Sequence, residues 1–157
     1  MAIGFQEGVT DIIVCLDGHG SRSSMRKPPE EVKARTKVEK VPIITLDSYV
    51  RNNNVKHIDF IKIDVEGAER DVLKGGIEVL TTLCPVLMVE MADVATQQFG
   101  YLAVENYKYL EDYGFVWFEV TPNGFLKAAK RKSTYRENLI AVPREKLRQI
   151  SDLMDAP

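Results

Sequence analysis

Histidine and cysteine are scarce in this sequence, which leaves little material for a metal centre or a catalytic thiol. Among 157 residues there are two cysteines, Cys15 and Cys84, and two histidines, His19 and His57. No pair of them has the spacing of metal ligands, and neither histidine has a context that favours pairing with a thiol. The cysteines lie far apart, in or beside apolar segments, so we expect reduced, buried thiols and a cytoplasmic protein.

Long hydrophobic runs and an excess of one charge are absent as well. No apolar run is long enough to span a bilayer, so we expect no membrane segment. The N-terminal residues MAIGFQE contain no basic region followed by an apolar core, so we expect no signal peptide. The formal net charge of −2 gives no reason to expect a nucleic-acid partner. The length of 157 residues fits one globular domain.

One stretch, residues 58–69 (IDFIKIDVEGAE), organises the rest of the chain. Its first half is almost continuously apolar and rich in isoleucine, which predicts a strand buried on both faces of a parallel sheet. Two acids then flank Gly67 and Ala68, and a helical pattern follows. A strand that ends in such a turn places its carboxylates at the carboxyl edge of a sheet, where α/β proteins bind their ligands.

Hydrophobic periodicity predicts the other elements. The predicted strands cover residues 9–16, 37–45, 86–89, 115–120 and 138–142. The first predicted helix is short, is capped by Thr45 or Asp47 and ends at residue 50. The second covers residues 68–80, with a break at Gly75 and Gly76. Two further helices are predicted over residues 104–113 and, as an amphipathic segment, over residues 144–154. Pro42 favours an edge position or a strand start for residues 37–45. Two strands joined through a helix form a parallel unit, so Asp64 and Glu90 are expected at the same sheet edge.

Two further segments each allow two interpretations. Residues 17–24 contain Gly18 and Gly20 and resemble a phosphate-binding loop, but the prolines at 28 and 29 block the helix that such a loop needs, and turn chemistry explains the glycines equally. Residues 127–136 are basic, which is typical of a solvated loop; contact with an anionic substrate is the alternative.

The motifs resemble those of the FkbM-type S-adenosylmethionine-dependent methyltransferases. The resemblance rests on residues 45–47 (TLD), 58–69, 72–76 (VLKGG), 85–90 (PVLMVE) and 137–143 (ENLIAVP), and it extends over about residues 9–143. Ser23 and Ser24 are similar to the serine pair of the family's inserted hairpin.

This resemblance implies an α/β protein with a partial class I methyltransferase (Rossmann-like) fold. The sheet is expected to be mostly parallel with a C-terminal antiparallel hairpin, and its first strands are expected to be missing. The whole chain, residues 1–157, is expected to form a single domain. Residues 1–57 would supply inserted strands and a connecting segment, residues 58–143 the C-terminal half of the sheet, and residues 144–157 a terminal helix.

The same resemblance implies S-adenosylmethionine as cofactor and four site residues. Asp64 is expected either to remove the acceptor's proton or to hold the ammonium group of the cofactor. Glu66 is the alternative base, Lys62 is expected to pair with a carboxylate, and Glu90 is expected to orient the acceptor. Glu66 and Glu69 are also explained as acids that favour the first turn of a helix.

Two functions remain open at this point. The first is an O-methyltransferase acting on a sugar or another hydroxylated small molecule. The second is a truncated, non-catalytic remnant or split-enzyme half, because the glycine-rich cofactor turn of the family is not recognisable before residue 58. Without its neighbour, the strand over residues 58–65 would be an unpaired edge. Such an edge would self-associate, pair with a complementing N-terminal fragment, or be covered by residues 9–16.

Overall fold

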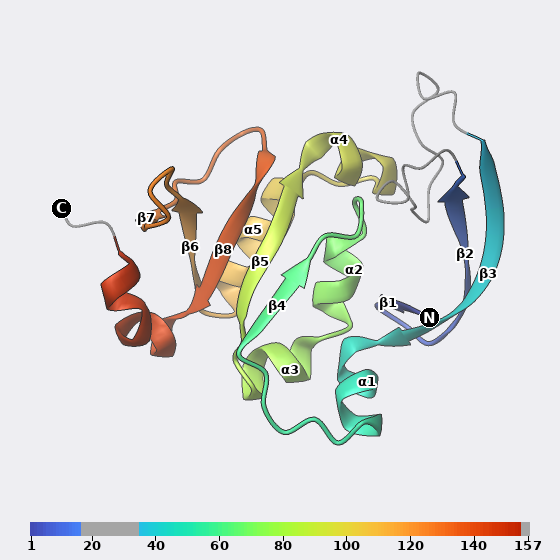
Figure 1. Ribbon diagram of the computed structural model, residues 1–157, viewed down its shortest axis with the longest axis horizontal. Helices are drawn as coiled ribbons and strands as arrows, with labels where there is room; N and C mark the ends of the chain where they lie inside the picture. The colour runs from blue at the N-terminus through green and yellow to red at the C-terminus, as the bar shows by residue number, and fades with distance from the viewer. Residues whose placement is uncertain (17–34, 155–157) are drawn as a thin grey trace.

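The computed structural model describes residues 1–16 and 35–154, which form two sheets (Figure 1). The segment over residues 17–24, with its two glycines and the serine pair, lies outside these residues. The smaller sheet has the order β1-β3-β2, and the larger has the order β4-β5-β8-β6-β7. The strands are β1 (Ala2–Gly4), β2 (Gly8–Cys15), β3 (Thr36–Thr45), β4 (Phe60–Ile63), β5 (Val86–Ala92), β6 (Phe115–Val120), β7 (Leu126–Ala128) and β8 (Arg136–Pro143).

The helices are short and follow the predicted order. They are α1 (Leu46–Asn52), α2 (Glu69–Lys74), α3 (Ile77–Thr82), α4 (Asp93–Thr96) and α5 (Ala103–Asp112), with 3-10 helices η2 (Gln97–Phe99) and η3 (Arg144–Leu153). Thr45 caps α1, accepting a hydrogen bond from Ser48 N at 3.0 Å. The Gly75–Gly76 pair separates α2 from α3 as predicted. The terminal segment, predicted as an amphipathic helix, is a 3-10 helix whose Leu153 is exposed.

The core of the molecule lies on one face of the larger sheet. The central strands β5 and β8 contribute fully buried side chains, and α5 packs against them. The buried residues of this core include Leu87, Val89, Met91, Leu110, Leu139 and Ala141. Trp117 stacks on Tyr107 of α5 with ring centroids 5.1 Å apart and donates a hydrogen bond to its carbonyl oxygen at 3.0 Å. On the opposite face, η3 packs its Leu147 and Ile150 against Phe118 and Ile140.

The sheet is not mostly parallel, contrary to the prediction. Among the described strands of the larger sheet, only β4 and β5 pair in parallel, and in the smaller sheet β1 and β3 do so. The pairs β5–β8, β6–β8 and β6–β7 are antiparallel, because the last strand of the chain returns between β5 and β6. The expected terminal hairpin therefore lies partly inside the sheet, with β8 as an interior strand and β7 at its edge.

Strand β4 lies at the opposite edge of the larger sheet, and the description of this segment as a fully buried strand is wrong. It spans four residues, and its Phe60 is 49% exposed. In the described part of the chain, β4 has a strand neighbour only in β5. The suggestion that residues 9–16 cover this edge is also wrong, because β2 pairs with β3 in the smaller sheet.

Pro42 has no amide hydrogen to donate, and the pairing of β3 explains why a proline is tolerated at this position. Although β3 is the middle strand of the smaller sheet, its pairing with β1 begins only at Ile43. Pro42 therefore has a neighbour on the β2 side, where it lies opposite Val9. The smaller sheet contacts the rest of the protein closely at Gly75, where an added Cβ would lie 2.0 Å from the Gly4 carbonyl oxygen.

Candidate functional site

The parallel pairing of β4 with β5 brings three of the four predicted site residues together. Lys62 lies opposite Met88 and Ile63 opposite Val89, so Asp64 follows beside Glu90. The Lys62 Nζ atom lies 2.7 Å from Asp64 Oδ2. This hydrogen bond, together with the attraction of the two charges, raises the pKa of Lys62. The predicted pairing of Lys62 with a carboxylate at this edge is therefore present.

Glu90 is the most perturbed acid of this edge. Burial raises its pKa to about 7, and repulsion from Asp64, Glu66 and Glu69, in that order, acts in the same direction. A hydrogen bond with Asp64 also favours the protonated form of Glu90. Since the Glu90 Oε2 atom is buried with no hydrogen-bond partner among the described residues, the carboxyl group can donate or accept one further hydrogen bond.

The turn that carries Glu66 has an unusual backbone. Glu66 has φ 54° and Gly67 has φ 101°, both in the left-handed region. A non-glycine residue in this region costs about 1 kcal/mol, so the surrounding contacts must hold Glu66 there. At Gly67 no side chain fits, because a Cβ atom would lie 2.4 Å from the carbonyl oxygen of Ala95 in the α4 segment.

Glu69 holds this turn from inside the protein. Its side chain is 1% exposed, and its Oε1 atom accepts hydrogen bonds from Gly67 N at 3.0 Å and Val65 N at 3.2 Å. Burial raises the pKa of Glu69, and these backbone hydrogen bonds oppose that rise. Glu69 therefore does more than place an acid in the first turn of α2. Sequence reasoning named it only as a helix-terminus acid, because the return of its carboxylate to the preceding turn depends on the folded backbone.

The edge as a whole suits a positively charged or hydroxylated ligand. Asp64 and Glu90 act on the Lys62 cation, and Glu66 lies close enough to act on Glu90. Carboxylates of this kind accept protons or hold an ammonium group. In the residues that the structure describes, no group of three or more His, Cys, Asp or Glu side chains has the geometry of a metal site. Asp64, at the end of β4, and Glu90 of β5 are the carboxylates at this edge that act on the Lys62 cation.

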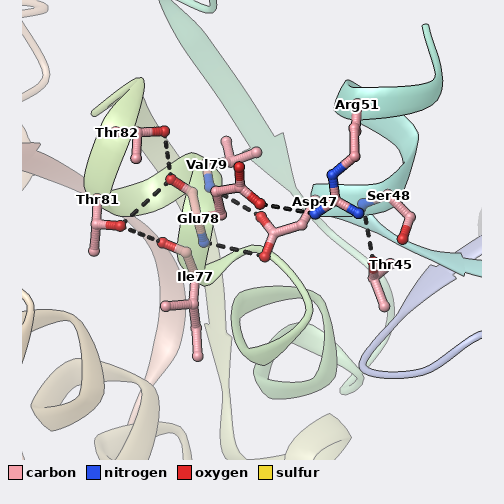
Figure 2. A network of polar contacts seen from close by, with 9 residues as sticks. All are labelled: Thr45, Asp47, Ser48, Arg51, Ile77, Glu78, Val79, Thr81 and Thr82. Atoms are coloured by element: carbon pink, nitrogen blue, oxygen red, sulfur yellow. Dashed lines mark hydrogen bonds and ion pairs between the residues drawn. The ribbon is translucent and has the colours of Figure 1, made fainter. Parts of the chain in front are cut away.

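A second polar cluster joins α1 to α3 (Figure 2). Asp47, predicted as a possible cap of α1, accepts hydrogen bonds from Glu78 N at 3.1 Å and Val79 N at 2.9 Å at the start of α3. Arg51 Nη2 lies 2.8 Å from Glu78 Oε2. A cavity of about 260 Å³ is lined by this cluster and by Val55, Lys56 and Leu83, and none of the predicted site residues lines it.

The basic run at residues 127–136 is partly neutralised by acids of the same protein. Arg131 pairs with Glu111, and Lys132 Nζ lies 2.7 Å from Glu137 and 2.9 Å from Glu119. The hydrogen bonds to Glu137 and Glu119 raise the pKa of Lys132. Arg131 is thus engaged with α5, and Lys132 with β6 and β8, which favours the structural interpretation of the run over contact with an anionic substrate.

Fold and site together define a mixed α/β protein with clustered carboxylates at the end of a parallel strand pair. The chain belongs to the FkbM methyltransferase family: the family's sequence model, described as the Methyltransferase FkbM domain, matches residues 5–117. The match includes Lys62, Asp64, Glu66 and Glu90 and ends within β6. Neither a curated protein nor a solved structure matches the chain. Within the described residues, no helix is both long and apolar enough to cross a membrane.

Proposed function

We propose that this protein acts as an S-adenosylmethionine-dependent O-methyltransferase on a hydroxylated small molecule or sugar. Membership in the FkbM family supports methyl transfer. The observation that carries the proposal is the meeting of Asp64, Glu66 and Glu90 at one sheet edge, where burial, followed by repulsion from the neighbouring acids, raises the pKa of Glu90 to about 7. A carboxyl group with such a pKa in a partly buried position is typical of a functional site.

The contacts of Asp64, Glu66 and Glu90 suggest a separate role for each in methyl transfer. The cofactor supplies the electrophilic methyl group, and the protein aligns the acceptor and removes its hydroxyl proton. Asp64, held by Lys62, accepts that proton or binds the ammonium group of the cofactor; Glu66 is the alternative base. Glu90, with a pKa of about 7, is half protonated near neutral pH and can donate a hydrogen bond to an acceptor oxygen.

Isothermal titration with S-adenosylhomocysteine tests this proposal directly. The wild-type chain is expected to bind, and Asp64→Asn is expected to weaken binding by about tenfold or more, since it removes a charge-assisted hydrogen bond. Asp59→Asn is the matched control, because Asp59 is an exposed acid near the start of the same strand. Its Oδ1 atom lies 2.7 Å from His57 Nε2. Absence of binding by the wild type, or equal binding by both variants, would contradict the proposal.

The exposed edge of β4 supports a second candidate, action through protein association. Phe60 is 49% exposed, and β4 lacks a strand on its outer side in the part of the chain that the structure describes. Such an edge pairs readily with another strand, from a second copy or from a complementing N-terminal fragment. Light scattering over a range of concentrations is expected to show a growing mass. A constant monomer mass, with rapid amide exchange throughout β4, would exclude self-association.

A further inference from the structure

Tyr101, 35 positions beyond Glu66 and just before α5, reaches the same turn from the other side. Its ring is 4% exposed, and its hydroxyl donates a hydrogen bond to the Gly67 carbonyl oxygen at 2.8 Å. The same hydroxyl lies 3.4 Å from Glu69 Oε2 and accepts a hydrogen bond from Arg70 N at 3.2 Å. Because burial raises the pKa of Tyr101 to about 12, the hydroxyl stays protonated and able to donate over the physiological range.

Tyr101 and Glu69 therefore form hydrogen bonds with the backbone of one peptide segment, residues 65–67. Glu69 binds the amide groups of Val65 and Gly67, on either side of Glu66, and Tyr101 binds the Gly67 carbonyl. The Arg70 guanidinium stacks over the Tyr101 ring at 4.0 Å and pairs with Glu105 of α5 at 2.8 Å. These contacts tie the turn to α5 through two independent routes, which explains how Glu66 keeps its left-handed backbone.

We propose that Tyr101 and Glu69 are positioning residues that fix the turn carrying Glu66, and thereby set how Asp64 and Glu66 face Glu90. This inference rests on the proposed function, in which those three carboxylates form the site. Neither positioning residue touches a reacting atom, so their effect passes through the geometry of the turn. A looser turn is expected to let Asp64 and Glu66 move away from Glu90, because the three acids repel one another.

The test compares Tyr101→Phe with Tyr107→Phe, a closely matched control. Tyr107 is also 4% exposed, and its hydroxyl donates to a backbone carbonyl, that of Ala129, at 3.0 Å. Both variants lose one hydroxyl and keep the ring. Tyr101→Phe loses the hydrogen bond to the Gly67 carbonyl and the weaker contacts with Glu69, Arg70 N and Asn106, whereas Tyr107→Phe loses the hydrogen bond to Ala129. Glu69→Ala is less suitable because it would leave buried amides without an acceptor and would also remove a charge that acts on Glu90.

The first readout is the titration of the Glu90 carboxyl carbon by NMR. In Tyr101→Phe the midpoint is expected to fall from about 7 towards 4.5 by about half a unit or more, because repulsion from the other acids weakens. The control is expected to titrate like the wild type. Loss of a hydrogen bond that serves only stability would leave both midpoints unchanged, and that result would overturn the inference.

The second readout is affinity for S-adenosylhomocysteine. Tyr101→Phe is expected to bind about fivefold more weakly, the effect of one hydrogen bond, and Tyr107→Phe is expected to bind within twofold of the wild type. Equal weakening by both variants would overturn the inference. If the wild type does not bind at all, the proposed function fails, and the Glu90 titration alone still decides whether Tyr101 positions the turn.

Discussion

Replacing Glu90 with glutamine is expected to stabilise the protein at pH 8 and to change little at pH 4.5. The pKa of Glu90 is about 7 in the fold, against an ordinary value of 4.5. Between these values the folded state keeps a proton that the unfolded state has lost. The wild type therefore loses stability as the pH rises from about 4.5 to about 7, and the loss is complete above pH 7. Glutamine resembles the protonated form and removes this dependence.

The size of the effect follows from the same two pKa values. The difference between them corresponds to a free energy of folding of about 3 kcal/mol for a carboxyl group that is fully shielded from solvent. Because Glu90 is only partly buried and its neighbours are near solvent, we discount the gain of Glu90→Gln at pH 8 to about 1–2 kcal/mol. In a protein of this length that is a rise of about 2–8 °C in Tm.

Urea denaturation at pH 4.5 and pH 8, followed by the fluorescence of the buried Trp117, measures this difference. Glu69, whose pKa burial also raises, is present in both proteins, so the burial of Glu69 itself is common to the two. Glu7→Gln removes an exposed acid and serves as the control. The reasoning is refuted if Glu90→Gln gains no more stability at pH 8 than at pH 4.5, or if the control gains as much.

Two further substitutions test the backbone around the site and the helix pair beyond it. Gly67→Ala is expected to destabilise the fold by about 2–4 kcal/mol, since its Cβ would meet the Ala95 carbonyl oxygen at 2.4 Å; Gly124→Ala, at φ 83° with open space around it, is expected to cost about 1 kcal/mol. Similar unfolding midpoints for the two would contradict this. Asp47→Ala is expected to cost about 1–2 kcal/mol, because it leaves two amide groups at the start of α3 without their acceptor. A thermal melt that matches the wild type would show that water replaces the carboxylate there.

The local pattern of the chain predicted most individual elements. The helix predicted over residues 104–113 is α5, and Gly114, with φ 83°, follows its end. The break at Gly75 and Gly76 and the bounds of β6 also agree with the prediction. Asp47 shows the limit of this reasoning: a residue with capping chemistry next to one helix caps another helix about 30 positions later, which spacing alone does not reveal.

Some residues of the candidate site could likewise be predicted from local sequence patterns, and others could not. Lys62, Asp64 and Glu90 could be placed together from two predicted strands joined by a helix, because parallel strands end at a common edge. Tyr101 and the buried role of Glu69 could not, since one comes from a distant segment and the other depends on a turn with two left-handed residues.

By itself, the sequence determined the family of the protein, the identity of its acids and the strand-to-helix turn that presents them. These are local properties, fixed by side-chain chemistry and hydrophobic period over a dozen residues. Only the tertiary structure decided that β8 returns antiparallel between β5 and β6, that β4 lies at an edge, and that α5 brings Tyr101 to the turn. Strand order and contacts between distant residues depend on which surfaces can be buried together, and that is a property of the whole folded chain.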